Sequence, residues 1–469
     1  MLLLITTLVP IAGVVASAGR LRRSVRRALY AAIMLLTDVL GLCTALFGGS
    51  LTIFQLTETV PLALSMDGMG RLFLALVLLL YTVSTFYAFE YLEHDRRWNM
   101  FFGFWFASLS AMISVCMAAN LVTLYLSFEL ATLTTMPLVL HDRTKEATAA
   151  ALKYLFYSIG GALLGLFAVL TLSSVGAGDF VYGGTMPAGS GREKLLRTSV
   201  VLGIVGFGAK AGMYPLHGWL PTAHPVAPAP ASALLSGIIV KAGILAVIRL
   251  VYYTAGPELL RGSWAQIVWM VLACVTVFTG SMMAWREKVL KKRLAYSTVS
   301  QLSYIMLGLS LLCEGGLKGA LLHTCAHVCA KGALFLCAGV FIHKLGKRNV
   351  EEMRGLVRQM PITVWCFWLA GLSLVGIPPM GGFVSKWQIA LTAIQKAPAP
   401  FSILIPVILL LSALLTAGYL LAPAVDAFFP SRDEKLPDEK AEPTPMMTVP
   451  LIILCCGTLA VGLFGNLLF

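Results

Sequence analysis

One glutamate and three lysines lie in apolar, helix-length stretches of the 469-residue sequence: Glu129, Lys210, Lys241 and Lys386. A charge at mid-membrane costs about 2.5–3.5 kcal/mol on insertion scales, and such residues mark ion and proton paths. Burial disfavours the charged form of a lysine, and a nearby carboxylate favours it. A buried lysine can therefore bind and release a proton when the charge of a neighbouring group changes. The set predicts a path for protons or sodium ions. For Glu129 and Lys210 a static ion pair that fixes helix register stays open as an alternative.

Two histidines extend this set. His323 and His327 are spaced i, i+4, so they share a helical face, and Lys331 lies one turn further towards the expected membrane edge. We treat Lys331 as a secondary candidate, together with Lys153, His217 and His224. Simpler interpretations remain: Lys241 and Lys386 could extend to an interface, and the histidines could serve only the structure. Six other charged residues are expected to be interfacial, towards span ends: Asp38, Asp67, Arg71, Glu90, Arg249 and Asp426.

The composition is that of a membrane protein with many spans. Hydrophobic residues make up 58% of the chain and charged residues 12%, whereas soluble domains carry about 25% charged residues. The net charge of +13 falls in short basic runs between apolar segments, as in cytoplasmic loops, and therefore does not indicate nucleic acid.

The cysteines and loops carry no redox signature. None of the ten cysteines forms a CxxC pair, and no glycine-rich nucleotide loop is present. We therefore expect no cofactor and no metal in this chain. A haem-bearing electron carrier is disfavoured because the two mid-span histidines lie on one helix.

Hydropathy predicts an all-α protein with about fourteen spans of roughly 20 residues. The first, residues 2–18, is expected to be retained, because positive charge follows it rather than precedes it. The loops after odd-numbered spans hold most of the arginines and lysines, so they are expected in the cytoplasm and both termini outside. The spans are 2–18, 29–48, 68–90, 100–119, 121–140, 147–174, 196–221, 231–254, 264–285, 294–313, 317–342, 361–395, 401–428 and 446–468.

Two of these spans are interrupted by glycine and proline, around residues 206–221 and 376–387. Freed backbone groups at membrane depth persist only where they line a cavity, and such breaks mark transport sites. They fall in the seventh and twelfth spans, and an odd offset forces opposite orientations. Spans 4–8 and 9–13 are thus expected to be inverted repeats, giving the divisions 1–99, 100–260, 261–430 and a charged linker with a last helix, 431–469.

Several motifs match one known family. The run 210–225, followed by 228–237 and Lys241-Ala242-Gly243, resembles the antiporter-like subunits shared by respiratory complex I, multisubunit sodium/proton antiporters, membrane-bound hydrogenases and formate hydrogenlyases. Residues 127–130, 295–302, 323–331 and 381–386 extend the resemblance over nearly the whole chain.

The resemblance implies a role for each candidate. Glu129 resembles the span-five glutamate, Lys210 the broken-helix lysine that pairs with it, Lys241 the bridging residue of span eight and Lys386 the terminal lysine of span twelve. His323 and His327 resemble the central histidines between two half-channels. Another complex I member has glutamate where this chain has Lys386, and the terminal complex I subunit continues into a lateral helix beyond the position of Phe469. Both departures favour a different assembly.

The expected function is therefore proton or sodium translocation within a redox-driven, complex I-like or hydrogenase-like complex of a prokaryotic inner membrane. Its partners would be further antiporter-like membrane subunits and soluble redox subunits that hold iron–sulfur, flavin or nickel–iron centres. A gradient-driven multisubunit sodium/proton antiporter is the alternative. A stand-alone carrier of organic solutes is a weaker one, because the lysines are spread along the chain instead of converging on one pocket.

Overall fold

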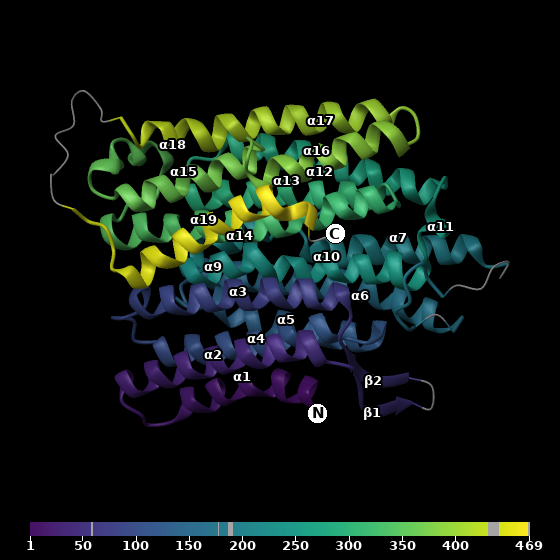
Figure 1. The fold of residues 1–469 in the computed structure, drawn as a ribbon, viewed down its shortest axis with the longest axis horizontal. Helices are drawn as coiled ribbons and strands as arrows, with labels where there is room; N and C mark the ends of the chain where they lie inside the picture. The colour runs from purple at the N-terminus through teal and green to yellow at the C-terminus, as the bar shows by residue number, and fades with distance from the viewer. Residues whose placement is uncertain (58–59, 177, 186–190, 430–439, 468–469) are drawn as a thin grey trace. The chain divides into compact units, whose positions relative to one another are not determined.

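The computed structural model of the chain describes residues 1–57, 60–176, 178–185, 191–429 and 440–467 (Figure 1). Most of these residues are helical. Ten helices are long and apolar enough to cross a membrane, and Leu2–Ala18 and Pro361–Val375 are shorter apolar helices within the same described ranges. The multi-pass, helical class is thereby confirmed, while the count of fourteen spans stays a prediction.

The chain divides into two compact units. Unit 1 comprises Met1–Thr85, Leu92–Ala211 and Ile238–Ala265. Its elements, which include the first part of α3, are α1 (Leu2–Ala18), α2 (Arg23–Phe47), β1 (Ser50–Thr57), β2 (Val60–Ser65), α3 (Gly68–Tyr91), α4 (Trp98–Met117), α5 (Leu121–Val139), α6 (Lys145–Ser173), α7 (Glu193–Lys210), α10 (Val240–Ile248), the π-helix η2 (Arg249–Ala255) and α11 (Pro257–Leu260).

Unit 2 comprises Phe86–Tyr91, Gly212–Gly237 and Gln266–Phe469. Its elements are α8 (Leu220–Val226), α9 (Ala229–Leu234), the start of the π-helix η1 (Leu235–Ile239), α12 (Trp264–Arg286), α13 (Leu290–Ser310), α14 (Glu314–Leu345), η3 (Val350–Met353), η4 (Leu356–Arg358), α15 (Pro361–Val375), α16 (Gly381–Lys396), α17 (Phe401–Thr416), η5 (Ala417–Leu421), α18 (Ala422–Asp426), α19 (Pro445–Phe464) and η6 (Gly465–Leu467).

Both interrupted spans contain a break. α7 ends at Lys210, and Gly212 adopts φ +72°, a left-handed conformation that suits glycine, before the chain resumes as α8. α15 ends at Val375 with Gly376 at φ +94°, and α16 starts at Gly381. Each break creates a helix C-terminus inside an apolar stretch of the chain.

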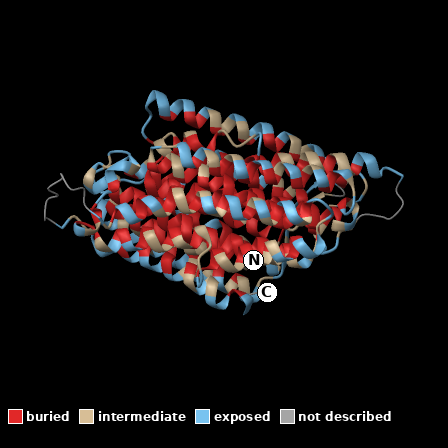
Figure 2. Ribbon diagram, turned by 90° about the horizontal axis from the view of Figure 1, so that it is seen from above, coloured by how far each residue is buried: buried red, intermediate tan, exposed pale blue. Residues whose placement is uncertain are grey.

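Large apolar side chains are exposed on the outer faces of the helices, as expected for a surface covered by lipid. Phe156 is 77% exposed and Leu410 is 72% exposed. Figure 2 shows the exposed residues following the outward sides of helices whose inward sides are buried.

Two local features differ from the sequence expectation. Residues 50–57 and 60–65 form the antiparallel strands β1 and β2, in a stretch between two predicted spans where no strand was predicted. Asp38 lies well inside α2, so the prediction that it lies towards a span end was wrong. Arg249 lies towards the end of the apolar helical stretch Ala229–Ala255 and is 2% exposed.

Candidate functional site

Lys210 is held by α5 in unit 1. It is the last residue of α7 and is 1% exposed. Its Nζ donates to Thr132 Oγ1 at 2.7 Å and to the Phe128 carbonyl at 3.1 Å, and it lies 4.1 Å from the centre of the Phe128 ring. A carbonyl and a hydroxyl accept hydrogen bonds from a charged ammonium and from a neutral amine alike, so this setting does not fix the charge of the lysine.

Glu129 follows Phe128 on α5 and is half-buried. It is close enough for its charge to act on Lys210, yet among the described residues no ion pair joins the two side chains. Oε1 of Glu129 is buried and receives no hydrogen bond from the part of the chain that the structure describes. The direct Glu129–Lys210 contact implied by the resemblance is therefore not formed in this structure.

Lys241 lies on α10, which packs against α4, α5 and α7, and is fully buried. Two residues on, Gly243 meets the end of α7: a Cβ built there would lie 2.5 Å from the Phe207 carbonyl oxygen and 3.3 Å from Lys210 Cβ. The missing side chain lets the two backbones approach, and this brings the Lys241 helix to the Lys210 break. Lys153 is half-buried on α6, and its ammonium lies 5.9 Å from the centre of the Tyr157 ring on its own helix.

Lys386 binds the helix end at the break in unit 2. It is 8% exposed, and its Nζ donates to the carbonyls of Leu374 at 2.5 Å and Val375 at 3.1 Å, in the last turn of α15. The ammonium lies 4.7 Å from the centre of the Tyr304 ring. The terminal carbonyls of a helix lack partners within the helix, so this lysine satisfies acceptors that the break creates.

Tyr304 also joins Lys386 to the histidines of α14. Its ring stacks on His323 with centroids 5.4 Å apart, and His323 Nδ1 lies 2.9 Å from Ser385 Oγ. The rings of His323 and His327 are 6.2 Å apart, and both residues are fully buried. Unit 2 thus brings together the two histidines and the lysine that the sequence singled out, with Tyr304 and Ser385 as members that it did not.

The secondary candidates are placed in different ways. Lys331 lies near the middle of the 32-residue α14, fully buried, and its Nζ donates to the Leu294 carbonyl at 2.9 Å, so it is not near the membrane edge as expected. His224 stacks on Phe335 at 4.6 Å, and His217 stacks on Tyr214 at 5.8 Å. These two histidines pack the segment after the first break.

Lys291 falls between the predicted spans 264–285 and 294–313, in a loop expected to be cytoplasmic, yet it is only 4% exposed and donates to the Ala227 carbonyl beyond the end of α8. Lys288, Lys292 and Arg293 surround it in the sequence and are basic, so hydropathy carries no signal for this burial. It caps a second helix end near the first break.

Arg249 forms a bidentate ion pair with Asp67 at the start of η2. The two N–O distances are 2.5 and 2.6 Å, and the guanidinium lies over the rings of Phe180 and Tyr253, 4.7 and 4.6 Å from their centres. Burial pushes the pKa of the Asp67 carboxyl up, but hydrogen bonds and charge from Arg249 outweigh this, and the net pKa lies below its usual value. We call this pair the Asp67–Arg249 clip.

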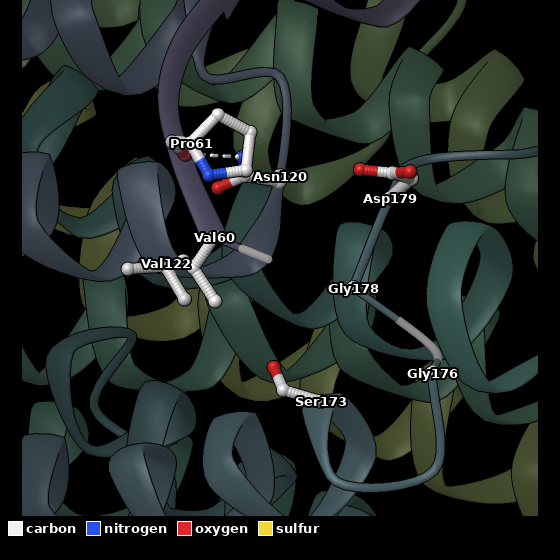
Figure 3. Close-up of a pocket in the computed structure, with 8 residues that line it drawn as sticks. All are labelled: Val60, Pro61, Asn120, Val122, Ser173, Gly176, Gly178 and Asp179. Carbon is white, nitrogen blue, oxygen red and sulfur yellow. Dashed lines mark hydrogen bonds between the residues drawn. The ribbon is translucent and has the colours of Figure 1, made fainter. Parts of the chain in front are cut away.

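The loop after α6 completes this end of unit 1. The last carbonyls of a helix lack partners within it, and those of Tyr253 and Tyr252 near the end of η2 accept the backbone N–H groups of Val181 and Gly183 at 3.0 and 2.9 Å. Beside the loop is a cavity of about 150 Å³ with room for water, next to the start of α5 (Figure 3). Its lining residues are Val60, Pro61, Asn120, Val122, Ser173, Gly176, Gly178 and Asp179.

Metal ligands do not cluster in the described ranges: no group of three or more His, Cys, Asp or Glu side chains there could hold an ion. The buried groups described above are titratable and hydrogen-bonding side chains. Their arrangement suits movement of protons along side chains.

Comparison with known proteins gives consistent relatives. Residues 118–417 match the family model described as NADH:quinone oxidoreductase/Mrp antiporter, transmembrane. The chain is 33% identical to hydrogenase-4 component B of Escherichia coli over 344 residues, 70% of this chain, and spans only about half (51%) of that relative. It is 30% identical to NADH-quinone oxidoreductase subunit N of Desulforudis audaxviator over 402 residues, 81% of this chain and 77% of the relative.

A solved structure agrees over almost the full length. A chain of the membrane-bound sulfane sulfur reductase, an archaeal respiratory membrane complex, superposes with a TM-score of 0.84 at 26% identity, covering 98% of this chain and 76% of that one. With the family model matched over residues 118–417, this chain belongs to the NADH:quinone oxidoreductase/Mrp antiporter transmembrane family.

Proposed function

We propose that the chain is the ion-translocating membrane subunit of a redox-driven complex I-like or hydrogenase-like assembly, and that it moves protons. One observation carries the proposal. In each unit a buried lysine at a helix break contacts a backbone carbonyl and an aromatic ring, with a hydroxyl added at Lys210 and a second carbonyl at Lys386. Within the described residues neither lysine forms an ion pair with a carboxylate. A lysine with a purely structural role is expected to be paired when buried, because an unpaired buried charge is costly.

The path would use the groups of each unit in turn. In unit 1, Glu129, Lys210 and Lys241 would pass the proton by alternating protonation, with Glu129 favouring the charged lysine when their side chains meet. In unit 2 the same role would fall to His323, His327 and Lys386. Lys331 is a further candidate, since it is buried on the same helix as the histidines.

The architecture that goes with this function is fourteen spans in two inverted repeats, spans 4–8 and 9–13, with both termini outside a prokaryotic inner membrane. The break at the end of α7 and the break at the end of α15 support the repeats. The redox chemistry would belong to soluble partner subunits with iron–sulfur, flavin or nickel–iron centres, and further membrane subunits would complete the complex.

The test is reconstitution of the native complex in liposomes, with ion uptake measured while the complex turns over. Lys210→Met and Lys386→Met should each abolish proton uptake, while Lys396→Met, at an exposed position on α16, should leave it unchanged. Normal uptake in either of the first two variants would refute the proposed path. Uptake that follows sodium concentration and resists protonophores would identify sodium as the ion.

A gradient-driven antiporter is the alternative, since the family model also describes Mrp antiporters. Mass spectrometry of the complex purified in mild detergent separates the two. Redox subunits are expected under the proposal. Small membrane subunits alone would favour the antiporter, and a lone active chain would favour a solute carrier.

A further inference from the structure

Asp38 is a carboxylate far from either end of a peripheral helix. It lies 11 residues after Arg27, the last of the arginines that precede and open α2, which is about 16 Å along the helix and half the thickness of a bilayer core of about 30 Å. It is half-buried, and its neighbours on the open face, Leu35 and Leu42, are 52% and 61% exposed. The carboxylate therefore borders a surface that lipid or another protein must cover.

The described residues satisfy this carboxylate only in part. Thr82 of α3 lies 2.9 Å from Oδ1 and 2.8 Å from Oδ2 through the same hydroxyl, which has a single hydrogen to donate. An ionised carboxylate accepts about four hydrogen bonds, so most of its capacity is unused in the part of the chain that the structure describes. Charged groups inside membranes face a bundle interior or pair with one another.

The residues around Asp38 form a helix-packing stripe. Ala31, Leu35, Asp38, Leu42 and Ala45 are spaced by 4, 3, 4 and 3 residues, the repeat that keeps one seam of a helix against a partner helix. Small residues stand at both ends and one polar residue at the centre, which are the features of transmembrane helix interfaces. None of the five is fully buried. We call these five residues the Asp38 stripe.

We propose that the Asp38 stripe is the docking site for a transmembrane helix of a different membrane subunit, and that this helix carries a lysine or arginine that pairs with Asp38. The charge requires a cationic partner in the apolar layer. A second copy of this chain related by two-fold symmetry would set Asp38 against Asp38, two like charges, and is therefore disfavoured. The central charge would fix the register of the two helices, as single polar residues do in helical seams.

This inference rests on the proposed function in one respect, that the chain works within a hetero-oligomeric membrane complex. It does not depend on which ion moves or on what drives it. Its test therefore reads the composition and geometry of the complex, and transport is left to the lysine variants.

The first measurement is photocrosslinking in native membranes, with p-benzoylphenylalanine in place of Leu42 and, as the matched control, in place of Leu36, which is 49% exposed on the other side of the same helix. The expected result is a crosslink from position 42, and none from position 36, to one helix of another subunit, within a turn of a lysine or arginine. Crosslinks from position 42 to lipid alone, or to a second copy of this chain, would overturn the proposal.

The second measurement is a charge swap in the purified complex. Asp38→Lys should lower the amount of the crosslinked subunit at least tenfold relative to this chain, and exchanging the partner's cation for aspartate should restore it. Asp38→Asn, which preserves shape, guards against misfolding and should give an intermediate loss. A wild-type subunit ratio in Asp38→Lys would refute the pairing. If the complex lacks redox subunits but the swap restores assembly, the proposed function fails and this inference stands.

Discussion

The Asp67–Arg249 clip offers a test of how unit 1 is held together, through the variant Asp67→Asn. Removing the charge leaves the Arg249 guanidinium, 2% exposed, without its counter-ion. Losing one partner of a fully buried pair costs about 3–5 kcal/mol. The Asp67 side chain is 37% exposed, so solvent screens part of this, and the flanking rings retain part of the cation's stabilisation. We expect a loss of about 2–3 kcal/mol at neutral pH.

The assay is thermal unfolding of the purified complex in detergent, compared with Glu258→Gln as the matched control. Glu258 pairs with Arg261 on the surface, with side-chain exposures of 75% and 47%. Exposed pairs contribute about 0–1 kcal/mol, so the control should unfold almost as the parent does. For a unit of this size the clip variant should unfold about 4–12 °C lower.

The pH dependence gives the sharper check. Because the folded-state pKa of Asp67 lies below its usual value, its stabilisation is fully present above the ordinary aspartate pKa of about 3.9 and is lost as the pH falls through the lower, folded value. The gap between parent and Asp67→Asn should be constant from about pH 8 to 5 and should close below about pH 4. Equal unfolding of Asp67→Asn and the control at pH 7, or a gap that persists at pH 2, would refute the reasoning.

Two other variants test the contacts at the lysines. Gly243→Ala places a Cβ 2.5 Å from a carbonyl oxygen of α7 and should lower the free energy of unfolding by about 1–3 kcal/mol. The control is Gly160→Ala on α6, where an added Cβ meets nothing within 4 Å. It should leave the free energy of unfolding unchanged or raise it by up to about 1 kcal/mol. Tyr304→Phe keeps the aromatic ring next to Lys386 and should retain proton uptake. Tyr304→Leu removes about 0.5–2 kcal/mol of cation–π stabilisation and should lower proton uptake. Equal uptake in the two variants would show that the ring is not needed.

Hydropathy and helix-breaking residues predicted much of this fold. The breaks fall where glycine and proline interrupt the apolar runs, since α7 ends at Lys210 and α15 ends at Val375. Strands β1 and β2 were not predicted because they are shorter than the apolar runs that define spans, although the alternation of Leu51 and Ile53 with Ser50 and Thr52 is typical of a strand.

The contacts within the site were less accessible to sequence reasoning. Burial of Lys291 and Lys331 depends on which helices cover them, and a single sequence does not record that packing. Tyr304 follows from no motif, because its role comes from a ring that lies between side chains of α14 and α16. The division into 1–99, 100–260, 261–430 and 431–469 stays a prediction, as do the roles of the individual site residues.

The two breaks place their lysines by different routes that have the same electrostatic result. Lys210 is itself in the last turn of α7, and Lys386 reaches from α16 to the last carbonyls of α15. Lys210 is a last-turn residue of one helix and the Lys386 ammonium lies at the last carbonyls of another, and near a helix C-terminus the backbone dipole favours a cation by about 0.3–2 kcal/mol. This stabilisation is weaker than the few kcal/mol of a close ion pair, so the helix dipole favours the protonated lysine and still allows the proton to be released. A continuous helix would provide no such end within the span. Both breaks can therefore serve to stabilise a buried lysine, and not only to make the helix flexible.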